Sequence, residues 1–331
     1  MKRSFDDVTS VPSSLRLLPQ LLRQDMVANQ QHTDQEPGAD RFTPMAPGAD
    51  RTTPMALVGA RDLYSDPPHR VAASARLFLH AGICVLESVL PAALIGNILV
   101  ATQAVLQRID EALEERGVSV EDDFSFNEVV RRGVGRYDVR FGAGMPLPAD
   151  TALDHPLLRD AAPWLPVVRR VLGLNAQEIF RGVVDNRPGS THQDYHMDGI
   201  PGERLEALTV FVPLVDIVPR VGPTEFFPGS HDSFRGALYA NLEATDHLGQ
   251  PQSAMPLPPR GSAILFDYRT IHRGTPFRDK DDEGEQQEDD RSCEKSASTP
   301  ASRPMLYFVY ARSDFVPADE KNFPCDVPLF S

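Results

Sequence analysis

The chain has 331 residues, of which 41% are hydrophobic and 24% charged, a balance typical of a folded protein with a sizeable core. Its formal net charge of −14 disfavours nucleic acid or an anionic membrane as the main partner, and no continuous apolar run is long enough to span a membrane. Three scattered cysteines, Cys84, Cys293 and Cys325, exclude a disulfide framework and a CxxC zinc site, and they indicate a reducing compartment.

Residues 1–65 are predicted to be a disordered leader. They contain a tandem decamer, PGADRFTPMA at 37–46 and PGADRTTPMA at 47–56, and two copies are too few to stack into a solenoid. Each copy has two prolines and a glycine, a composition that disfavours a packed core. No signal peptide is evident, because Arg16 and Pro19 interrupt the one apolar patch, so we expect a cytoplasmic protein.

Residues 66–331 are predicted to form one domain that starts with two helices and a strand. Apolar residues recur at helical spacing over 71–80, and Gly82 ends this helix. A short apolar strand is expected at 83–86. Pro91 then opens a long helix that ends at Gly117.

From about residue 124 the pattern becomes mainly β. Short β-branched and aromatic runs alternate with Gly/Pro turns, and one helix interrupts them at 164–172. The expected strands cover 136–141, 178–184, 208–217, 224–227, 262–266 and 305–310. Such spacing indicates a barrel or a double-sheet jelly roll with α-helices on its outside. Residues 279–300 carry nine acids and three bases, and we expect them to form a disordered loop inserted between two strands.

Two overlapping His-x-Asp units carry the first chemical signal. They lie in STHQDYHMDG at 190–199, as His192/Asp194 and His196/Asp198. On a strand, residues i and i+2 face the same side, so one unit can direct an imidazole and a carboxylate at one ion. A histidine from another strand would complete a 2-His-1-carboxylate site, which suits non-haem Fe(II) because three positions stay open. A His-x-Asp unit alone is also common at polar strand ends.

Two later segments strengthen the metal hypothesis. Residues 260–274 predict a turn and a buried strand followed by His272, just before Gly274. Arg303 begins another apolar strand directly after the acidic insertion. A buried arginine can hold a dicarboxylate through two parallel hydrogen bonds.

These blocks, taken in order over about residues 75–325, resemble the phytanoyl-CoA dioxygenase family of Fe(II)/2-oxoglutarate-dependent oxygenases. QDYHMDG at 193–199 resembles the iron-binding block of the family, and GPTEFFPGSH at 222–231 resembles the turn block that follows it. LFDYRTIHRG at 265–274 resembles the block of the distal histidine, and RPMLY at 303–307 resembles the block of the 2-oxoglutarate arginine. The resemblance implies a double-stranded β-helix (jelly-roll, cupin-like) core.

Position by position, the resemblance implies that His196, Asp198 and His272 are both the catalytic residues and the iron ligands. The second His-x-Asp unit is preferred because Gly199 follows it and Gln193 precedes it as in the family. His192 and Asp194 are then expected at a polar rim.

For the co-substrate, the resemblance implies that Arg303 pairs with the far carboxylate of 2-oxoglutarate. Arg303 follows His272 at a longer interval in the sequence than in the family. Without the acidic insertion, this interval would match that of the family. Arg278 is the competitor, but it begins no strand. Gln193, in the iron-binding block, and Phe211, on a strand expected to line the pocket, complete the predicted cofactor-binding set.

Two departures from the family pattern bear on the chemistry. Thr275-Pro276-Phe277 stands where the family often has Asn, so a hydrogen bond near the co-substrate is either missing or supplied by another group. Asp198 is present as the carboxylate ligand, whereas halogenating relatives have a small residue there. Hydroxylation or desaturation is therefore favoured.

The predicted activity is oxidation of a small-molecule substrate with Fe(II), 2-oxoglutarate and O2, releasing succinate and CO2. Two alternatives stay open: a cupin-like metal isomerase that does not use 2-oxoglutarate, and a degenerate member that binds metal or ligand as a sensor. Neither nucleic acid nor a membrane is expected as a partner, and the sequence leaves the substrate and the oligomeric state open.

Overall fold

A computed structural model describes residues 58–59, 67–119, 122–142, 152–199, 204–232, 253–278, 300–315, 325 and 327–330. All of them belong to one compact unit, Pro54–Ser331. Both copies of the decamer and residues 279–299 of the acidic insertion lie outside the described residues. The predictions of a disordered leader and a disordered loop are therefore not tested here.

The N-terminal elements follow the predicted order. They are β1 (Val58–Gly59), α3 (Pro67–Ala81), β2 (Ile83–Glu87) and α4 (Ala92–Glu115). Gly82 ends α3 with a φ of 72°, a left-handed conformation that glycine adopts without steric cost. Strand β1 lies inside the range 1–65, where the sequence predicts no structure, and it pairs in parallel with β2. A strand of two residues is too short to show periodicity in the sequence, and it is recognised only by its pairing with another strand.

The elements that follow are mostly strands. They are β3 (Val129–Arg131), β4 (Arg136–Arg140), the 3-10 turns η2 (Ala152–Asp154) and η3 (Pro156–Leu158), α5 (Leu165–Leu172), β5 (Gln177–Asn186), β6 (Ala207–Pro213), β7 (Thr224–Phe226), β8 (Ala263–Asp267), β9 (His272–Gly274) and β10 (Arg303–Ala311). The six strands predicted after residue 124 are all present. The sequence missed β3 and β9, which at three residues each are too short to show alternation. The strand predicted to reach Ile217 ends at Pro213, whose nitrogen has no hydrogen to donate.

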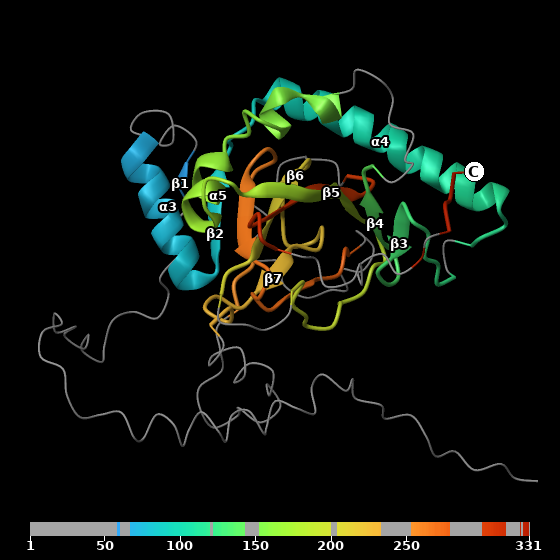
Figure 1. Cartoon of the computed structure of the whole chain (residues 1–331). Helices are drawn as coiled ribbons and strands as arrows, with labels where there is room; N and C mark the ends of the chain where they lie inside the picture. Colours follow the sequence, from blue (N-terminus) through green and yellow to red (C-terminus); the bar gives the residue numbers. More distant parts are fainter. Residues whose placement is uncertain are drawn as a thin grey trace, which may run out of the picture. The chain divides into compact units, whose positions relative to one another are not determined.

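The strands form two sheets in a jelly-roll arrangement. The larger has eight strands in the order β1-β2-β8-β6-β10-β5-β4-β3, and the smaller pairs β7 with β9. Every pairing is antiparallel except that of β1 with β2. The predicted fold class, mainly β with flanking helices around a double-stranded β-helix core, is confirmed (Figure 1).

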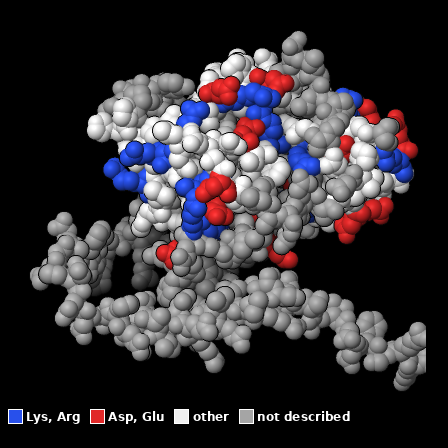
Figure 2. Space-filling model, viewed as in Figure 1, with Lys and Arg blue, Asp and Glu red and all other residues white. Residues whose placement is uncertain are grey.

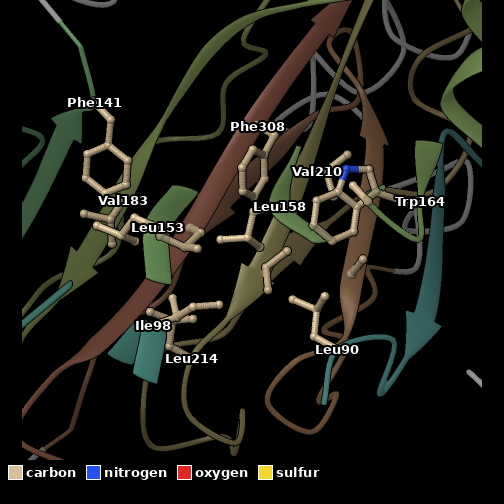
Figure 3. Close-up of a cluster of buried hydrophobic side chains, with 14 of the residues drawn as sticks. Leu90, Ile98, Phe141, Leu153, Leu158, Trp164, Val183, Val210, Leu214 and Phe308 are labelled. Carbon is tan, nitrogen blue, oxygen red and sulfur yellow. The ribbon is translucent and has the colours of Figure 1, made fainter. Parts of the chain in front are cut away.

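The outer face of the larger sheet packs against α3, α4 and α5. Alternate residues of the strands, such as Leu306 and Phe308 of β10, join helix residues such as Phe78 and Ile98 in one hydrophobic cluster. Figure 3 shows part of it, with Trp164 beside Phe308; their ring centroids are 5.2 Å apart. The indole of Trp164 also donates to the hydroxyl of Tyr310 (3.1 Å).

The intervening residues form the inner face, which meets the smaller sheet. Met305, Tyr307 and Val309 of β10 join Phe211 and Phe266 in a second cluster. Phe226 of β7 closes this cluster, with its ring centroid 5.2 Å from that of Phe266. The inner face is where the predicted site residues gather.

Helix α4 is long and apolar enough to cross a membrane by length and composition alone. Eight of its residues are buried, however, and the seven apolar ones, among them Leu94, Ile98 and Ile109, all belong to the outer-face cluster. Packing in the core accounts for the composition of this helix. On the described surface in the view of Figure 2, acidic and basic side chains lie interspersed.

Candidate metal centre and co-substrate pocket

His196, Asp198 and His272 converge on one point. One ligand atom from each lies within 4.8 Å of those of the other two, and His272 Nε2 is 3.7 Å from Asp198 Oδ1. Atoms that are each about 2.1 Å from one ion lie roughly 3–4 Å apart, so this donor set fits a single metal ion. His272 is buried, whereas His196 and Asp198 are half-buried. One side of the group is therefore accessible.

The His-x-Asp unit reaches the site differently from the prediction. The described residues 187–199 and 204–206 contain no named strand; His196 instead forms an isolated bridge to His272 of β9, through two main-chain hydrogen bonds of 3.0 and 2.9 Å. The two histidine ligands are thus cross-strand neighbours, with ring centroids 4.5 Å apart. The i, i+2 spacing still brings Asp198 to the same side.

Main-chain carbonyls orient both imidazoles. Nδ1 of His196 is 2.8 Å from the carbonyl of Asp194, and Nδ1 of His272 is 2.9 Å from the carbonyl of Thr270. When Nδ1–H donates to these carbonyls, each Nε2 keeps its lone pair for a metal. Thr209 of β6, which the sequence did not single out, donates its hydroxyl to Asp198 Oδ2 (3.4 Å).

The first His-x-Asp unit does not join this group. The side chains of His192 and Asp194 are exposed. Asp194 contributes to the site only through its main-chain carbonyl. The geometry therefore agrees with the choice of the second unit.

The structure adds a second arginine next to Arg303. Asn186 of β5 pairs with Arg136 of β4 on one side and with Arg303 of β10 on the other, so the three residues form one cross-strand row. All three are buried. Arg303 donates through Nε to the carbonyl of Val221 (3.2 Å). The sequence missed Arg136 because its proximity to Arg303 depends on the strand order.

The arginine row is short of negative charge. Burial lowers the pKa of Arg303, and the positive charge of Arg136 lowers it further. Asp185 partly offsets this, but its carboxylate is itself paired with Arg187 (2.8 Å). Arg136 Nε and Asn186 Oδ1 are buried with no hydrogen-bond partner within the part of the chain that the structure describes. A bound carboxylate would compensate the charge and satisfy the free donor.

Gly274 connects the arginine row with the metal ligands. A Cβ on Gly274 would lie 2.6 Å from Cζ of Arg136 and 2.7 Å from Oε1 of Gln193, so any larger residue would displace these two side chains. The side-chain Oε1 of Gln193 accepts from the main-chain N–H of Gly274 (2.9 Å), and the main-chain N–H of Gln193 donates to the Gly274 carbonyl (3.0 Å). Gln193 thus holds its segment against β9. Contact of Gln193 with the co-substrate stays a prediction.

Aromatic side chains separate the site from the rest of the inner face. Phe211 packs edge-on against Phe266 at 4.9 Å, and Phe266 lies 4.8 Å from the ring of His272. Phe226 stacks on His272 at 5.7 Å. Phe211 therefore lies in the aromatic layer beside the site, as expected for the strand on which it was placed.

Thr275, in the segment where the family often has Asn, contacts Arg136 and Pro223. The carbonyl of Thr275 accepts from Arg136 Nη2 (3.0 Å), and the hydroxyl of Thr275 donates to the carbonyl of Pro223 (2.6 Å). Arg278, the competitor of Arg303, is exposed. The structure thus places Arg303, and not Arg278, in the buried row.

A second polar group, also missed by the sequence analysis, lies on the inner face next to the metal ligands. Asp138 of β4 accepts two hydrogen bonds from Arg132 and interacts with the hydroxyl of Tyr307. Burial raises the pKa of Tyr268, and the negative charges of Asp198 and Asp138 raise it further. The hydroxyls of Tyr268 and Tyr307 thus lie close enough to a carboxylate near the metal site for its negative charge to raise their pKa.

A family model and several solved structures match the chain. The family model for phytanoyl-CoA dioxygenase (PhyH) matches residues 78–281, more than half of the chain. Among solved structures, AviO1 from Streptomyces viridochromogenes Tue57 is 17% identical with a TM-score of 0.51, and the match covers 75% of this chain and 97% of that one. The non-heme alpha ketoglutarate dependent epimerase SnoN from nogalamycin biosynthesis is 17% identical with a TM-score of 0.48, covering 79% and 95%. The chain belongs to the phytanoyl-CoA dioxygenase family of iron- and 2-oxoglutarate-dependent oxygenases.

Proposed function

We propose that the protein oxidises a C–H bond of a small molecule, by hydroxylation or desaturation, with Fe(II) held by His196, Asp198 and His272. We propose further that 2-oxoglutarate lies between this metal and the buried pair of Arg303 and Arg136. The observation that carries the proposal is the position of two under-compensated buried cations beside a His-Asp-His group on one face of the fold.

The dimensions of the site fit a five-carbon dicarboxylate. His272 and Gly274 are two residues apart on β9, so their Cα atoms are about 6.5–7 Å apart and both face the site. The guanidinium of Arg136 lies against Gly274. The terminal carbons of an extended 2-oxoglutarate are roughly 5 Å apart, from four C–C bonds of about 1.5 Å. A molecule of this length can reach the metal with one end and the arginines with the other.

When bound, iron with 2-oxoglutarate and O2 supplies the oxidation: one oxygen atom enters succinate, CO2 leaves, and the second atom enters the product in a hydroxylation. The protein holds the reactants. His196, Asp198 and His272 would hold the metal as three ligands, a set that suits a metal with open positions for further ligands. Arg303 and Arg136 fix the far carboxylate, and the layer of Phe211, Phe226 and Phe266 excludes water.

The substrate is proposed to bind next to Asp138, Tyr268 and Tyr307. These side chains offer a carboxylate and two hydroxyls beside Asp198. Such groups would orient a substrate that carries its own hydroxyl or amine. A cytoplasmic location remains a prediction from the sequence.

The test is succinate release and incorporation of one atom of ¹⁸O from O2 into product, with Fe(II), 2-oxoglutarate and candidate substrates. We expect Arg303→Leu to lower succinate release and raise the KM for 2-oxoglutarate. A metal isomerase would instead keep its full activity in Arg303→Leu and would need no 2-oxoglutarate. A sensor would bind metal, and no substrate would trigger decarboxylation of 2-oxoglutarate.

A further inference from the structure

A buried carboxylate lies on the other side of the metal-binding strand. Glu225 is the central residue of β7 and pairs with Arg273 of β9, while its neighbour Phe226 pairs with His272. Since successive strand residues face opposite sides, Glu225 and Arg273 lie on the face turned away from the metal ligands. Glu225 is 8% exposed.

One oxygen of Glu225 holds the two segments that carry the ligands. Its Oε2 accepts from Nε of Arg273 (2.7 Å), the residue after His272. The same Oε2 accepts from the hydroxyl of Tyr195 (3.2 Å), the residue before His196. One carboxylate thus bonds to a neighbour of each histidine.

Contacts between the two donors complete this group. The guanidinium of Arg273 lies over the ring of Tyr195, with Cζ 4.0 Å from its centroid. Tyr195 also packs edge-on against Phe227 at 4.9 Å. Charge-assisted bonds and the cation–π contact hold Tyr195 in one place next to β9.

The other hydrogen bonds that tie residues 193–198 to the rest of the described chain go to β9, from Gln193 and His196, and to Thr209 of β6, which donates to Asp198. A small displacement of this segment would change the distance of His196 and Asp198 from His272. On the side of the segment that carries Tyr195, the described hydrogen bond is the one from its hydroxyl to Glu225.

We infer that Glu225 is a positioning residue of the metal centre, which sets the spacing between the segment of His196 and Asp198 and the strand of His272. This inference rests on the proposed function, because it assumes that the three ligands bind metal. Glu225 is not a member of the His196, Asp198 and His272 group. It acts through Tyr195 and Arg273.

The test measures affinity for Mn(II), a redox-stable probe, in the full-length protein. We expect Glu225→Ala to weaken Mn(II) binding by about 10- to 100-fold, the range found when groups that orient metal ligands are removed. Tyr195→Phe removes one bond without changing charge, and it should weaken binding by a smaller factor. Glu225→Gln keeps an acceptor oxygen and should fall between Glu225→Ala and the wild type.

Glu178→Ala is the matched control, since Glu178 forms an ion pair with Arg181 on a strand, outside the metal group. It should lower the Tm by an amount similar to Glu225→Ala and leave Mn(II) affinity unchanged. The absorption spectrum of bound Co(II) should change in Glu225→Ala and Tyr195→Phe, but not in Glu178→Ala.

Wild-type affinity in Glu225→Ala would overturn the inference. Equal losses in Glu225→Ala and Glu225→Gln, with none in Tyr195→Phe, would also overturn it, because the loss would then follow the negative charge of Glu225 and not its hydrogen bond to Tyr195. His196→Ala separates this test from that of the proposed function. If His196→Ala bound Mn(II) like the wild type, the ligand assignment itself would be wrong.

Discussion

The two faces of the larger sheet are built from the same strands, yet they differ in chemistry. In β10, Leu306, Phe308 and Tyr310 face the helices, whereas Arg303, Met305 and Tyr307 face the smaller sheet. The outer face holds apolar side chains packed on α3, α4 and α5. The inner face combines an aromatic layer with buried arginine and asparagine and the half-buried Asp138.

This difference separates stability from function within single strands. Outer-face side chains bury apolar area, the main favourable term in folding. Inner-face charges cost free energy when they are buried without a partner, and the fold keeps them beside the site. Substitutions on the two faces should therefore affect different measurements.

The largest expected effect concerns the ligands that meet the inner face. His196→Ala or Asp198→Ala should reduce succinate release to the level of metal-free protein, because two ligands do not hold the ion in place. His192→Ala and Asp194→Ala are the controls in the same segment, and they should retain activity because both side chains are exposed. Full turnover in Asp198→Ala would refute the assignment.

On the outer face, Phe308→Ala should lower the free energy of unfolding by about 3–5 kcal/mol, the usual cost of removing a buried aromatic ring. Phe308 is 2% exposed and packs on Trp164. Urea unfolding followed by fluorescence gives the change. The KM for 2-oxoglutarate should stay the same at a temperature where the variant is folded, and a changed KM would argue against independent faces.

On the inner face of the same strand, Arg303→Leu should do the reverse. Loss of a charge-assisted contact of about 1.5–3 kcal/mol should raise the KM for 2-oxoglutarate roughly 10- to 100-fold. The free energy of unfolding should stay unchanged or increase, since an apolar residue replaces a buried charge. Arg136→Gln should show a smaller effect in the same direction, and the exposed Arg278→Gln should show none.

The smallest effect is expected from a single hydrogen bond on the outer face. Trp164→Phe keeps an aromatic ring and removes the donor to the Tyr310 hydroxyl. We expect a loss of about 1 kcal/mol in unfolding free energy, because Tyr310 is left with one partner fewer in a buried place. Activity should be unchanged; a loss comparable with that of Phe308→Ala would point to a packing defect.

Part of the site could be predicted because its residues form local patterns. His196 and Asp198 belong to one short block, His272 follows an apolar run, and Arg303 begins another. The helices and the longer strands showed clear periodicity. Short elements such as β1, β3 and β9 did not, because pairing with other segments defines them and not their own residues.

The sequence by itself determined the family and the main elements, and it predicted the candidate ligands, since these depend on spacing along the chain. Only the tertiary structure showed that Arg136, Asn186 and Arg303 form one row, because strand order and register bring distant residues together. The same holds for Asp138 beside Tyr307 and for Glu225 beneath the two histidine segments. Such contacts run across strands, where sequence spacing carries no information.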